Sequence, residues 1–330
     1  MLYVSGEEST SQIKMRAERL GLGGTGIDLL AETSVDNIAA TIEIGSYGLV
    51  IIDSIQTMYS EQQTSAPGTL GQVTASAQVL QMVAKKTHTS VLIIGHVTKE
   101  GSIAGPKILE HLVDVVLYLE GERYGSFKSL RGIKNRFGST NEVGIFEMTG
   151  KGMVAVSNPS EAMLKERQES PGSVVLPTME GSRPILVEVQ ALTSPTIFGY
   201  PKRTASGIDL NRLNLLAAVM QKHARINLNN QDIFVNIVGG LKITEPAADL
   251  AIILSIASAF KNVIIKPHLV AFGEVGLSGE IRSVASIQKR LAEAKKLGFT
   301  QAIGPGYSGD KGSLMGVKTV ADAIRMALES

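Results

Sequence analysis

The chain has 330 residues and nearly balanced charges, with 32 Lys and Arg against 31 Asp and Glu, for a net charge of +1. This length suits about two domains of roughly 150 residues each. Cysteine is absent, which excludes disulfides, thiolate zinc sites and cysteine nucleophiles. The near-neutral charge does not mark a nucleic-acid-binding protein, so any contact with DNA requires a local basic surface.

The five histidines show no metal-binding spacing of the H-x-x-x-H kind, so we expect no zinc in this chain. The N-terminal residues lack the basic flank and the apolar run of a signal peptide. No apolar run approaches the roughly 20 residues that span a bilayer. We therefore expect a cytoplasmic protein without membrane contact.

The first half alternates short apolar runs with amphipathic segments, a pattern typical of strands joined by helical crossovers in a parallel sheet. The expected strands cover residues 2–4, 49–53, 91–94 and 113–119. The expected helices cover residues 9–20, 35–42 and 73–86, and Ser34 is a candidate cap for the second of them.

The alternation ends near Gly150, and a polar segment with Asn-Pro and Ser-Pro-Gly turns follows. A second α/β unit starts near Val174, with strands expected at 185–190 and 233–238 and helices at 210–223, 246–260 and 284–297. We predict one domain over residues 1–156, a linker over 157–176 and a second domain over 177–330.

The buried strand Leu49–Asp53 ends in a carboxylate, at the sheet edge where open α/β sheets bind ligands. Asp53 can hold a water on a magnesium ion beside nucleotide phosphates, as in P-loop ATPases. The partner motif of such a strand is G-x-x-x-x-G-K-[ST], whose backbone amides cradle phosphate. The sequence lacks it: Gly150-Lys151 has Ile145 in place of the first glycine and Gly152 in place of the hydroxyl residue.

The segment Gly21 to Gly26 matches the dinucleotide fingerprint G-x-G-x-x-G. The fingerprint requires a strand before it and a helix after it, whereas this segment follows an expected helix and precedes an apolar stretch. We interpret the glycines as a helix stop.

Other polar residues follow the first and third expected strands, at residues 2–4 and 91–94. Glu7, after the first strand, can polarise a water that attacks a γ-phosphate, or it can simply favour the dipole of the following helix. His96 ends the strand at 91–94 and can contact the same ligand, or it can be structural.

Two long glycine-containing segments, at 56–72 and 98–107, leave the same edge. Lys99 and Lys107 can touch a DNA backbone there, or the segments can be simple loops. The string Lys134-Asn135-Arg136-Phe137-Gly138-Ser139 suits a strand-end loop that presents cations to a neighbouring subunit's phosphate, or a solvated basic turn.

Three stretches together resemble the bacterial RadA (Sms) DNA-repair family: the opening Leu2 to Ser9, the strand Leu49 to Gln56, and the string Lys134 to Ser139. The resemblance covers essentially the whole chain. It implies a RecA-like P-loop ATPase core, incomplete at its N-terminus, followed by an α/β Lon-protease-like (ribosomal S5 domain 2-like) domain. The zinc module and the phosphate-binding loop of the family would lie upstream, so we expect an N-terminally truncated chain that binds ATP weakly or not at all.

The resemblance further implies a homo-hexameric ring on single-stranded and branched DNA that uses ATP and magnesium to drive branch migration with a RecA-type recombinase. By position, Glu7 would be the catalytic base and Asp53 the acid linked indirectly to magnesium, with Ser54 and His96 beside the nucleotide. Lys134 and Arg136 would act on nucleotide or DNA across a subunit interface. Lys202 and Arg203, in a loop after a strand, are further candidate DNA contacts, or part of an ordinary turn.

The second half also raises the possibility of a Ser–Lys protease. By the same resemblance, Ala247 occupies the position of the nucleophile and Gln288 that of the lysine. A methyl group cannot attack a carbonyl, so we expect no protease activity. A DNA-translocating ring ATPase is the preferred hypothesis, and a non-catalytic ring scaffold that binds DNA or a recombinase is the alternative.

Overall fold

The computed structural model describes residues 1–330 except 24–25, 97–107, 122–125, 198, 308–311 and 329–330. The chain divides into two compact units, each with its own hydrophobic core. Unit 1 comprises Met1–Leu117, Ile133–Gly138 and Gly150–Gly152; unit 2 comprises Tyr118–Gly132, Ser139–Thr149 and Met153–Ser330. The division expected at residues 156 and 176 stays a prediction.

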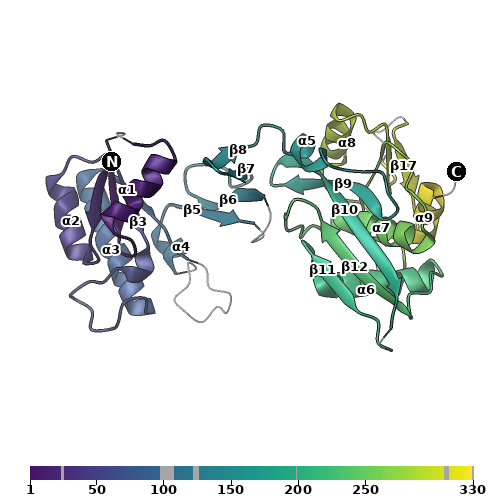
Figure 1. Cartoon of the computed structure of the whole chain (residues 1–330), viewed down its shortest axis with the longest axis horizontal. Helices are drawn as coiled ribbons and strands as arrows, with labels where there is room; N and C mark the ends of the chain where they lie inside the picture. Colours follow the sequence, from purple (N-terminus) through teal and green to yellow (C-terminus); the bar gives the residue numbers. More distant parts are fainter. Residues whose placement is uncertain (24–25, 97–107, 122–125, 198, 308–311, 329–330) are drawn as a thin grey trace. The chain divides into compact units, whose positions relative to one another are not determined.

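Unit 1 is built on a parallel four-stranded sheet with the order β2-β1-β3-β4. Its strands are β1 (Leu2–Ser5), β2 (Asp28–Ala31), β3 (Leu49–Asp53) and β4 (Ser90–Ile93). The connecting helices are α1 (Thr10–Arg19), α2 (Val35–Ile44) and α3 (Leu70–Thr87). The chain moves one way from β1 to β2 and the other way from β2 to β3, so right-handed crossovers place α1 on one face and α2 and α3 on the other. Helices α2 and α3 accordingly pack against each other (Figure 1).

Local sequence signals set the ends of these helices. Ser9 caps α1 in a reciprocal capping box with Gln12, and Ser34 accepts a hydrogen bond from the Asn37 amide at the start of α2. After α1, Gly21 adopts a φ of 73°, the left-handed conformation in which helices commonly end. The interpretation of this glycine as a helix stop is confirmed.

A second four-stranded sheet, with the order β5-β6-β7-β8, has residues in both units. It consists of β5 (Val115–Glu120), β6 (Phe127–Asn135), β7 (Val143–Thr149) and β8 (Gly152–Ala155), and the short helix α4 (Leu109–Leu112) precedes it. Strands β6 and β7 are antiparallel, with Phe127 opposite Glu147. Phe127, Val143 and Ile145 join the core of unit 2.

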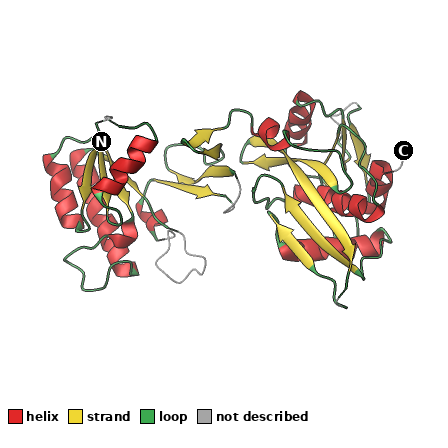
Figure 2. Ribbon diagram, viewed as in Figure 1, coloured by secondary structure: helices red, strands yellow, loops and turns green. Residues whose placement is uncertain are grey.

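Unit 2 is organised around a mixed seven-stranded sheet with the order β11-β12-β10-β9-β13-β16-β17 (Figure 2). Its strands are β9 (Ser173–Glu180), β10 (Arg183–Pro195), β11 (Arg203–Ser206), β12 (Gln231–Ile237), β13 (Leu269–Ala271), β16 (Gln301–Pro305) and β17 (Leu314–Val317), with a separate hairpin of β14 (Glu274–Val275) and β15 (Ile281–Arg282). Its helices are α5 (Pro159–Leu164), α6 (Leu210–His223), α7 (Asp249–Lys261), α8 (Ile287–Lys296) and α9 (Val320–Leu328). Strand β9 begins at Ser173, inside the segment 157–176 that the sequence suggested as a linker, because the apolar run at 174–176 follows the turn directly.

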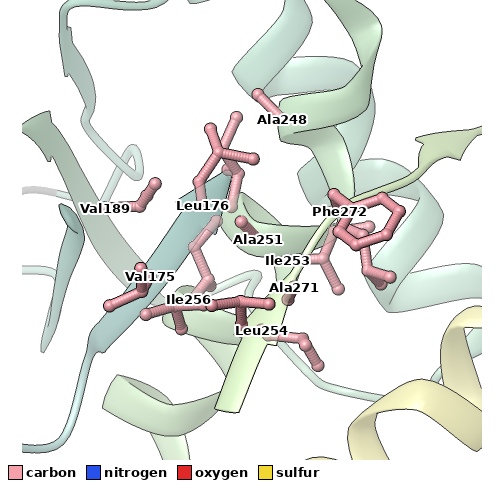
Figure 3. Close-up of a cluster of buried hydrophobic side chains, with 14 of the residues drawn as sticks. Val175, Leu176, Val189, Ala248, Ala251, Ile253, Leu254, Ile256, Ala271 and Phe272 are labelled. Atoms are coloured by element: carbon pink, nitrogen blue, oxygen red, sulfur yellow. The ribbon is translucent and has the colours of Figure 1, made fainter. Parts of the chain in front are cut away.

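Helix α7 forms the centre of unit 2. Residues 249–258 of this helix are all buried, as expected for a helix that is apolar all round. Figure 3 shows side chains of α7, such as Ile253 and Leu254, in one cluster with Val175 of β9, Val189 of β10 and Phe272, which follows β13. The helix therefore packs on the sheet and fixes the segment that precedes it, which includes Ala247.

The expected α/β fold class is confirmed, with a parallel sheet in unit 1. Among the residues that the structure describes, no helix has both the length and the apolar character needed to cross a bilayer.

Candidate functional site

The carboxyl edge of the unit 1 sheet brings together residues from three strands. Glu7 follows β1, Asp53 is the last residue of β3, and His96 follows β4. Strands β1 and β3 are parallel neighbours, with Ser5 opposite Asp53. The connections after β1 and β3 run in opposite directions across the sheet, so this edge is the topological switch point where open α/β sheets bind ligands.

Glu7 lies at the centre of one group of contacts. Its Oε1 atom accepts a hydrogen bond of 2.7 Å from Ser54 Oγ and lies 3.6 Å from His96 Nε2. Ser54 is fully buried, whereas the side chains of Glu7 and His96 are 46% and 60% exposed. A carboxylate that is held by a buried hydroxyl and remains open to solvent can orient a water and accept its proton.

Asp53 makes a separate contact. Its Oδ2 atom accepts a hydrogen bond of 2.5 Å from the Tyr3 hydroxyl. Burial raises the pKa of Tyr3, and the hydrogen bond and negative charge of Asp53 raise it further. The phenol therefore keeps its proton and acts as a donor to Asp53 throughout the physiological pH range.

The turn after β3 is tightly packed against the turn after β1. The turn after β3 contains the 3₁₀ turn η1 (Ile55–Thr57), whose Ile55 side chain is buried in the core. The two turns are joined by a hydrogen bond of 2.9 Å from the Gly6 amide to the Asp53 carbonyl. A Cβ atom at Gly6 would lie 2.1 Å from Thr57 Oγ1, so only glycine fits beside this turn. This close packing fixes the spacing between Glu7 and Ser54.

Two further residues near this edge, Tyr3 and Gln56, were not predicted from the sequence to belong to the site. Tyr3 was identifiable in principle, because it lies on the same face of the sheet as Asp53 in adjacent strands. Gln56 donates from Nε2 to the His96 carbonyl at 3.2 Å and so ties the end of β4 to η1. No motif in the sequence indicated that contact.

The donor set at this edge fits a hydrated magnesium ion bound together with phosphates. Magnesium commonly keeps several waters and uses only one or two carboxylates plus substrate phosphates. Glu7 and Asp53 supply two carboxylates. Within the described residues, no group of three or more His, Asp or Glu could hold a metal ion.

Lys134, near the end of β6, and Arg136, directly after it, belong to unit 1 and contact other residues of that unit. Lys134 Nζ donates to the carbonyls of Glu110 at 2.6 Å and Val113 at 2.8 Å. Arg136 forms a 2.9 Å ion pair with Asp114, in which both side chains are 53% exposed. The lysine thus secures the turn before β5, and the arginine is the more accessible of the two cations.

The remaining candidate DNA contacts differ in environment. Lys99 and Lys107 lie outside the described residues. Lys202 is exposed, whereas the Arg203 guanidinium donates to the carbonyls of Lys202 at 3.2 Å, Leu228 at 3.1 Å and Gln231. Burial lowers the pKa of Arg203. Its hydrogen bonds hold the loop together, and Lys202 is the side chain that faces solvent.

Ala247 and Gln288, the residues that the resemblance to a Ser–Lys protease singled out, occupy different environments in unit 2. Ala247 lies in the 3₁₀ turn η2 (Pro246–Ala248) and is 2% exposed, and Gln288 is exposed on α8. Neither side chain is a nucleophile or a base. Next to them in sequence, Arg290 and Glu245 form a 2.6 Å ion pair in which Arg290 is 1% exposed.

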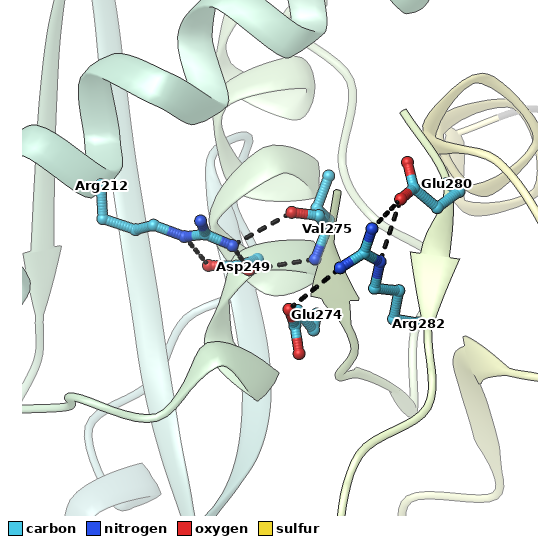
Figure 4. Close-up of polar contacts among 6 residues, drawn as sticks. All are labelled: Arg212, Asp249, Glu274, Val275, Glu280 and Arg282. Atoms are coloured by element: carbon cyan, nitrogen blue, oxygen red, sulfur yellow. Dashed lines mark hydrogen bonds and ion pairs between the residues drawn. The ribbon is translucent and has the colours of Figure 1, made fainter. Parts of the chain in front are cut away.

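A second ion pair secures the start of α7. Arg212 donates to both carboxylate oxygens of Asp249, and Asp249 in turn accepts from the Val275 amide at 3.0 Å (Figure 4). Burial raises the pKa of Asp249, and Arg212 opposes this effect. On the neighbouring hairpin Arg282 lies between Glu280 and Glu274 (Figure 4). Each of these carboxylates faces an arginine, which indicates a structural role, although Oε2 of Glu280 is buried and has no hydrogen-bond partner among the described residues.

The parallel sheet of unit 1, with its acidic residues at the switch point, has the fold of ATPase domains. Residues 1–102 match the family model described as AAA domain, and residues 191–307 match that of subunit ChlI of Mg-chelatase.

Similarity to curated proteins extends along the whole chain. The DNA repair protein RadA of Bacillus subtilis is 50% identical over 335 residues, which cover 99% of this chain and 73% of that protein. RadA of Streptococcus pneumoniae is 50% identical over 96% of this chain and 74% of its own length. RadA of Pseudomonas aeruginosa is 49% identical over 97% of this chain and 71% of its own. The chain belongs to the RadA DNA repair protein family, and the recognition made from the sequence is confirmed.

Proposed function

We propose that this chain is part of an ATP-driven motor for DNA repair and homologous recombination, which works in the cytoplasm as a homo-hexameric ring. The observation that carries the proposal is the meeting of Glu7, Ser54, Asp53 and His96 at the switch point of a parallel sheet, in a chain half identical to RadA proteins. The ring would move on single-stranded or branched DNA and promote branch migration beside a RecA-type recombinase.

In this proposal each residue at the edge has one task. Asp53 holds a water of the magnesium ion, and Glu7 accepts the proton of the attacking water while Ser54 fixes its carboxylate. His96 lies beside Glu7 and can contact the bound nucleotide. A magnesium ion, when bound with ATP, would neutralise charge that develops on the phosphates.

We also propose that these 330 residues by themselves bind ATP weakly. Their sequence contains no G-x-x-x-x-G-K-[ST], so the backbone cradle and the lysine that normally hold the phosphates are not supplied by these residues. Carboxylates alone repel a polyphosphate, and magnesium offsets only part of that repulsion.

Cations at several points would contact DNA or a neighbouring nucleotide. Lys202 is exposed, and Arg136 is half-exposed in an ion pair that salt and phosphate can displace. Lys134, Arg203, Lys99 and Lys107 complete the proposed set. For Lys134 and Arg203 the hydrogen bonds to carbonyls support an indirect role, in which they shape the loops that meet DNA.

We further propose that unit 2 is a Lon-protease-like domain that serves assembly and DNA contact without proteolysis. The support is the pair of non-catalytic side chains, Ala247 and Gln288, together with the ion pair between Arg290 and Glu245, two residues away from each of them in sequence. Cleavage of casein by this chain would overturn this part of the proposal.

The experiment that tests the motor is ATP hydrolysis with and without single-stranded DNA. The isolated chain should show little activity, and joining it to the phosphate-binding segment of the Bacillus subtilis relative should produce DNA-stimulated hydrolysis. Glu7→Gln and Asp53→Asn should then abolish the rate, whereas Glu43→Gln, in an exposed ion pair with Lys86, should preserve it. Hydrolysis that survives both site substitutions would refute the proposed site, and an inert joined chain would favour the scaffold alternative.

A further inference from the structure

The strand register explains why Tyr3 can reach Asp53. In the parallel pair β1–β3, Ser5 lies opposite Asp53 and Tyr3 lies opposite Ile51. Side chains alternate between the faces of a sheet, so Tyr3 and Asp53 share a face as diagonal neighbours, within reach of an aromatic side chain. The phenol spans this diagonal and ends at Oδ2 of Asp53, at 2.5 Å.

The two carboxylate oxygens of Asp53 are thereby distinguished. Oδ2 is occupied by the phenol, and Oδ1 has no hydrogen-bond partner among the residues that the structure describes. A carboxylate with no donor on either oxygen rotates freely about its terminal torsion. One anchored oxygen restricts that rotation and leaves the other available.

We propose that Tyr3 is a positioning residue for metal–nucleotide binding: its phenol orients the Asp53 carboxylate so that Oδ1 is available to a water of the magnesium ion. This inference rests on the proposed function, because it assumes that the nucleotide binds at this edge. Tyr3 lies in the opening stretch Leu2 to Ser9 that carries the family resemblance, but no role for it was predicted from the sequence.

Two effects of the phenol oppose each other. As a donor it withdraws charge from Asp53, which weakens the attraction of the carboxylate for a cation. It also holds the carboxylate in one orientation, which removes the entropic cost of fixing it when the metal binds. Removing the hydrogen-bonded partners of ligating carboxylates generally lowers metal affinity about 10-fold or more, so orientation outweighs charge withdrawal.

The chain contains a matched control on the same sheet. Tyr47 also lies beside an aspartate, Asp28, whose interaction with the phenol raises the pKa of Tyr47 after the larger effect of desolvation. Asp28 is the first residue of β2 and Tyr47 precedes β3, so this pair lies at the amino edge of the parallel strands. Tyr47→Phe therefore removes the same chemistry at the edge away from Glu7 and Asp53.

The experiment uses the whole chain labelled with ¹³C at the Cε1 atoms of its histidines. His96 lies 3.6 Å from Glu7 and reports the approach of paramagnetic Mn²⁺, added with excess ATP, by line broadening. Weak binding is no obstacle, since the titration can extend to millimolar concentrations. Tyr3→Phe should raise the Mn²⁺–ATP concentration for half-broadening of His96 about 10-fold, and Tyr47→Phe should leave it unchanged.

The outcomes separate the two proposals. If His96 broadens equally in Tyr3→Phe and in the unaltered chain, while Asp53→Asn abolishes the broadening, the nucleotide site stands and the role of Tyr3 is refuted. If His96 never broadens in the unaltered chain, the proposed nucleotide site fails and the inference fails with it.

A second readout requires no nucleotide and remains decisive if Tyr3→Phe folds poorly. With ¹³Cζ-tyrosine, Tyr3 should stay protonated at about pH 11, where an unperturbed tyrosine is largely ionised, and Asp53→Asn should bring its ionisation to lower pH. Ionisation of Tyr3 at the ordinary pH in the unaltered chain would show that the phenol does not hold Asp53, and would overturn the inference.

Discussion

Removal of Arg290 provides the most demanding test of how unit 2 is stabilised. Arg290 is 1% exposed, and its guanidinium donates to Glu245 Oε1 at 2.9 Å, to Glu245 Oε2 at 2.6 Å and to the Pro177 carbonyl at 2.6 Å. Arg290→Met keeps much of the aliphatic volume but leaves Glu245 without its countercharge.

The expected cost follows from the burial of the pair. Breaking a buried ion pair by removing one partner costs about 3–5 kcal/mol. The Glu245 side chain is 22% exposed and keeps hydrogen bonds from Thr178 Oγ1 at 2.6 Å and the Met179 amide at 2.8 Å. These contacts reduce the penalty, so we expect a loss near the lower limit, about 3 kcal/mol in the free energy of unfolding of unit 2.

The pH dependence of this loss has a definite sign. Burial alone would raise the pKa of Glu245, but the hydrogen bond and charge of Arg290, together with the hydrogen bonds from Thr178 and Met179, outweigh it, so the folded pKa lies below the ordinary value. The pair therefore stabilises the fold above the unfolded pKa of about 4.3, and this stabilisation is lost as the pH falls through the folded value. In Arg290→Met the unpaired, buried carboxylate gains a proton more readily, so the difference between variant and unaltered chain should shrink as the pH falls from 7 toward about 4.

The assay is hydrogen exchange followed by mass spectrometry through a urea series, read on peptides from α7, which belongs to the core of unit 2. This choice separates unit 2 from unit 1, and the absence of tryptophan removes the usual fluorescence signal. Arg325→Met, in the exposed pair with Asp322, serves as the control and should cost less than about 0.5 kcal/mol. A loss below about 1 kcal/mol for Arg290→Met, or a loss independent of pH, would contradict the reasoning.

Three further predictions concern packing and the loops. Gly6→Ala should destabilise unit 1 by about 1–3 kcal/mol because its new Cβ meets the adjacent turn, whereas Gly48→Ala, with open space around it, should be neutral in urea unfolding. Leu254→Ala should cost about 2–5 kcal/mol, since the side chain is fully buried, and a loss below 1 kcal/mol by urea unfolding would contradict the packing seen around α7. Lys202→Gln should weaken binding to single-stranded DNA in fluorescence anisotropy without changing stability, whereas Arg203→Gln should lower the thermal unfolding temperature; equal effects in both assays would be inconsistent with their different environments.

The sequence predicted well those elements that carry strong local signals. The run Leu49–Asp53, the cap at Ser34 and the long apolar helix after Pro246 all lie where they were expected. Strands β6 to β8 were not predicted, because their exposed and buried positions are mixed and neighbouring strands rather than local pattern stabilise them. Strand β2 was missed for a similar reason, since it has only four residues, none of them fully buried.

For the candidate site too, the position of each residue along the chain was predictable from local sequence, whereas its contacts with residues of other strands were not. That Glu7, Asp53 and His96 would share an edge was deducible, because the carboxyl ends of parallel strands meet there. The hydrogen bonds of Glu7 to Ser54 and of Asp53 to Tyr3 depend on the register between β1 and β3. Register is fixed by the packing of the two faces and cannot be read from one strand at a time.

If the edge binds a nucleotide as proposed, these contacts separate nucleotide affinity from catalytic geometry. Both carboxylates are oriented by the chain's own residues, a buried hydroxyl for Glu7 and a protonated phenol for Asp53. Neither contact involves a phosphate-binding loop, so the geometry of the acids does not depend on one. A loop that binds phosphate would therefore add affinity to a site that is already arranged, and supplying it should change the concentration of ATP required far more than the positions of Glu7 and Asp53.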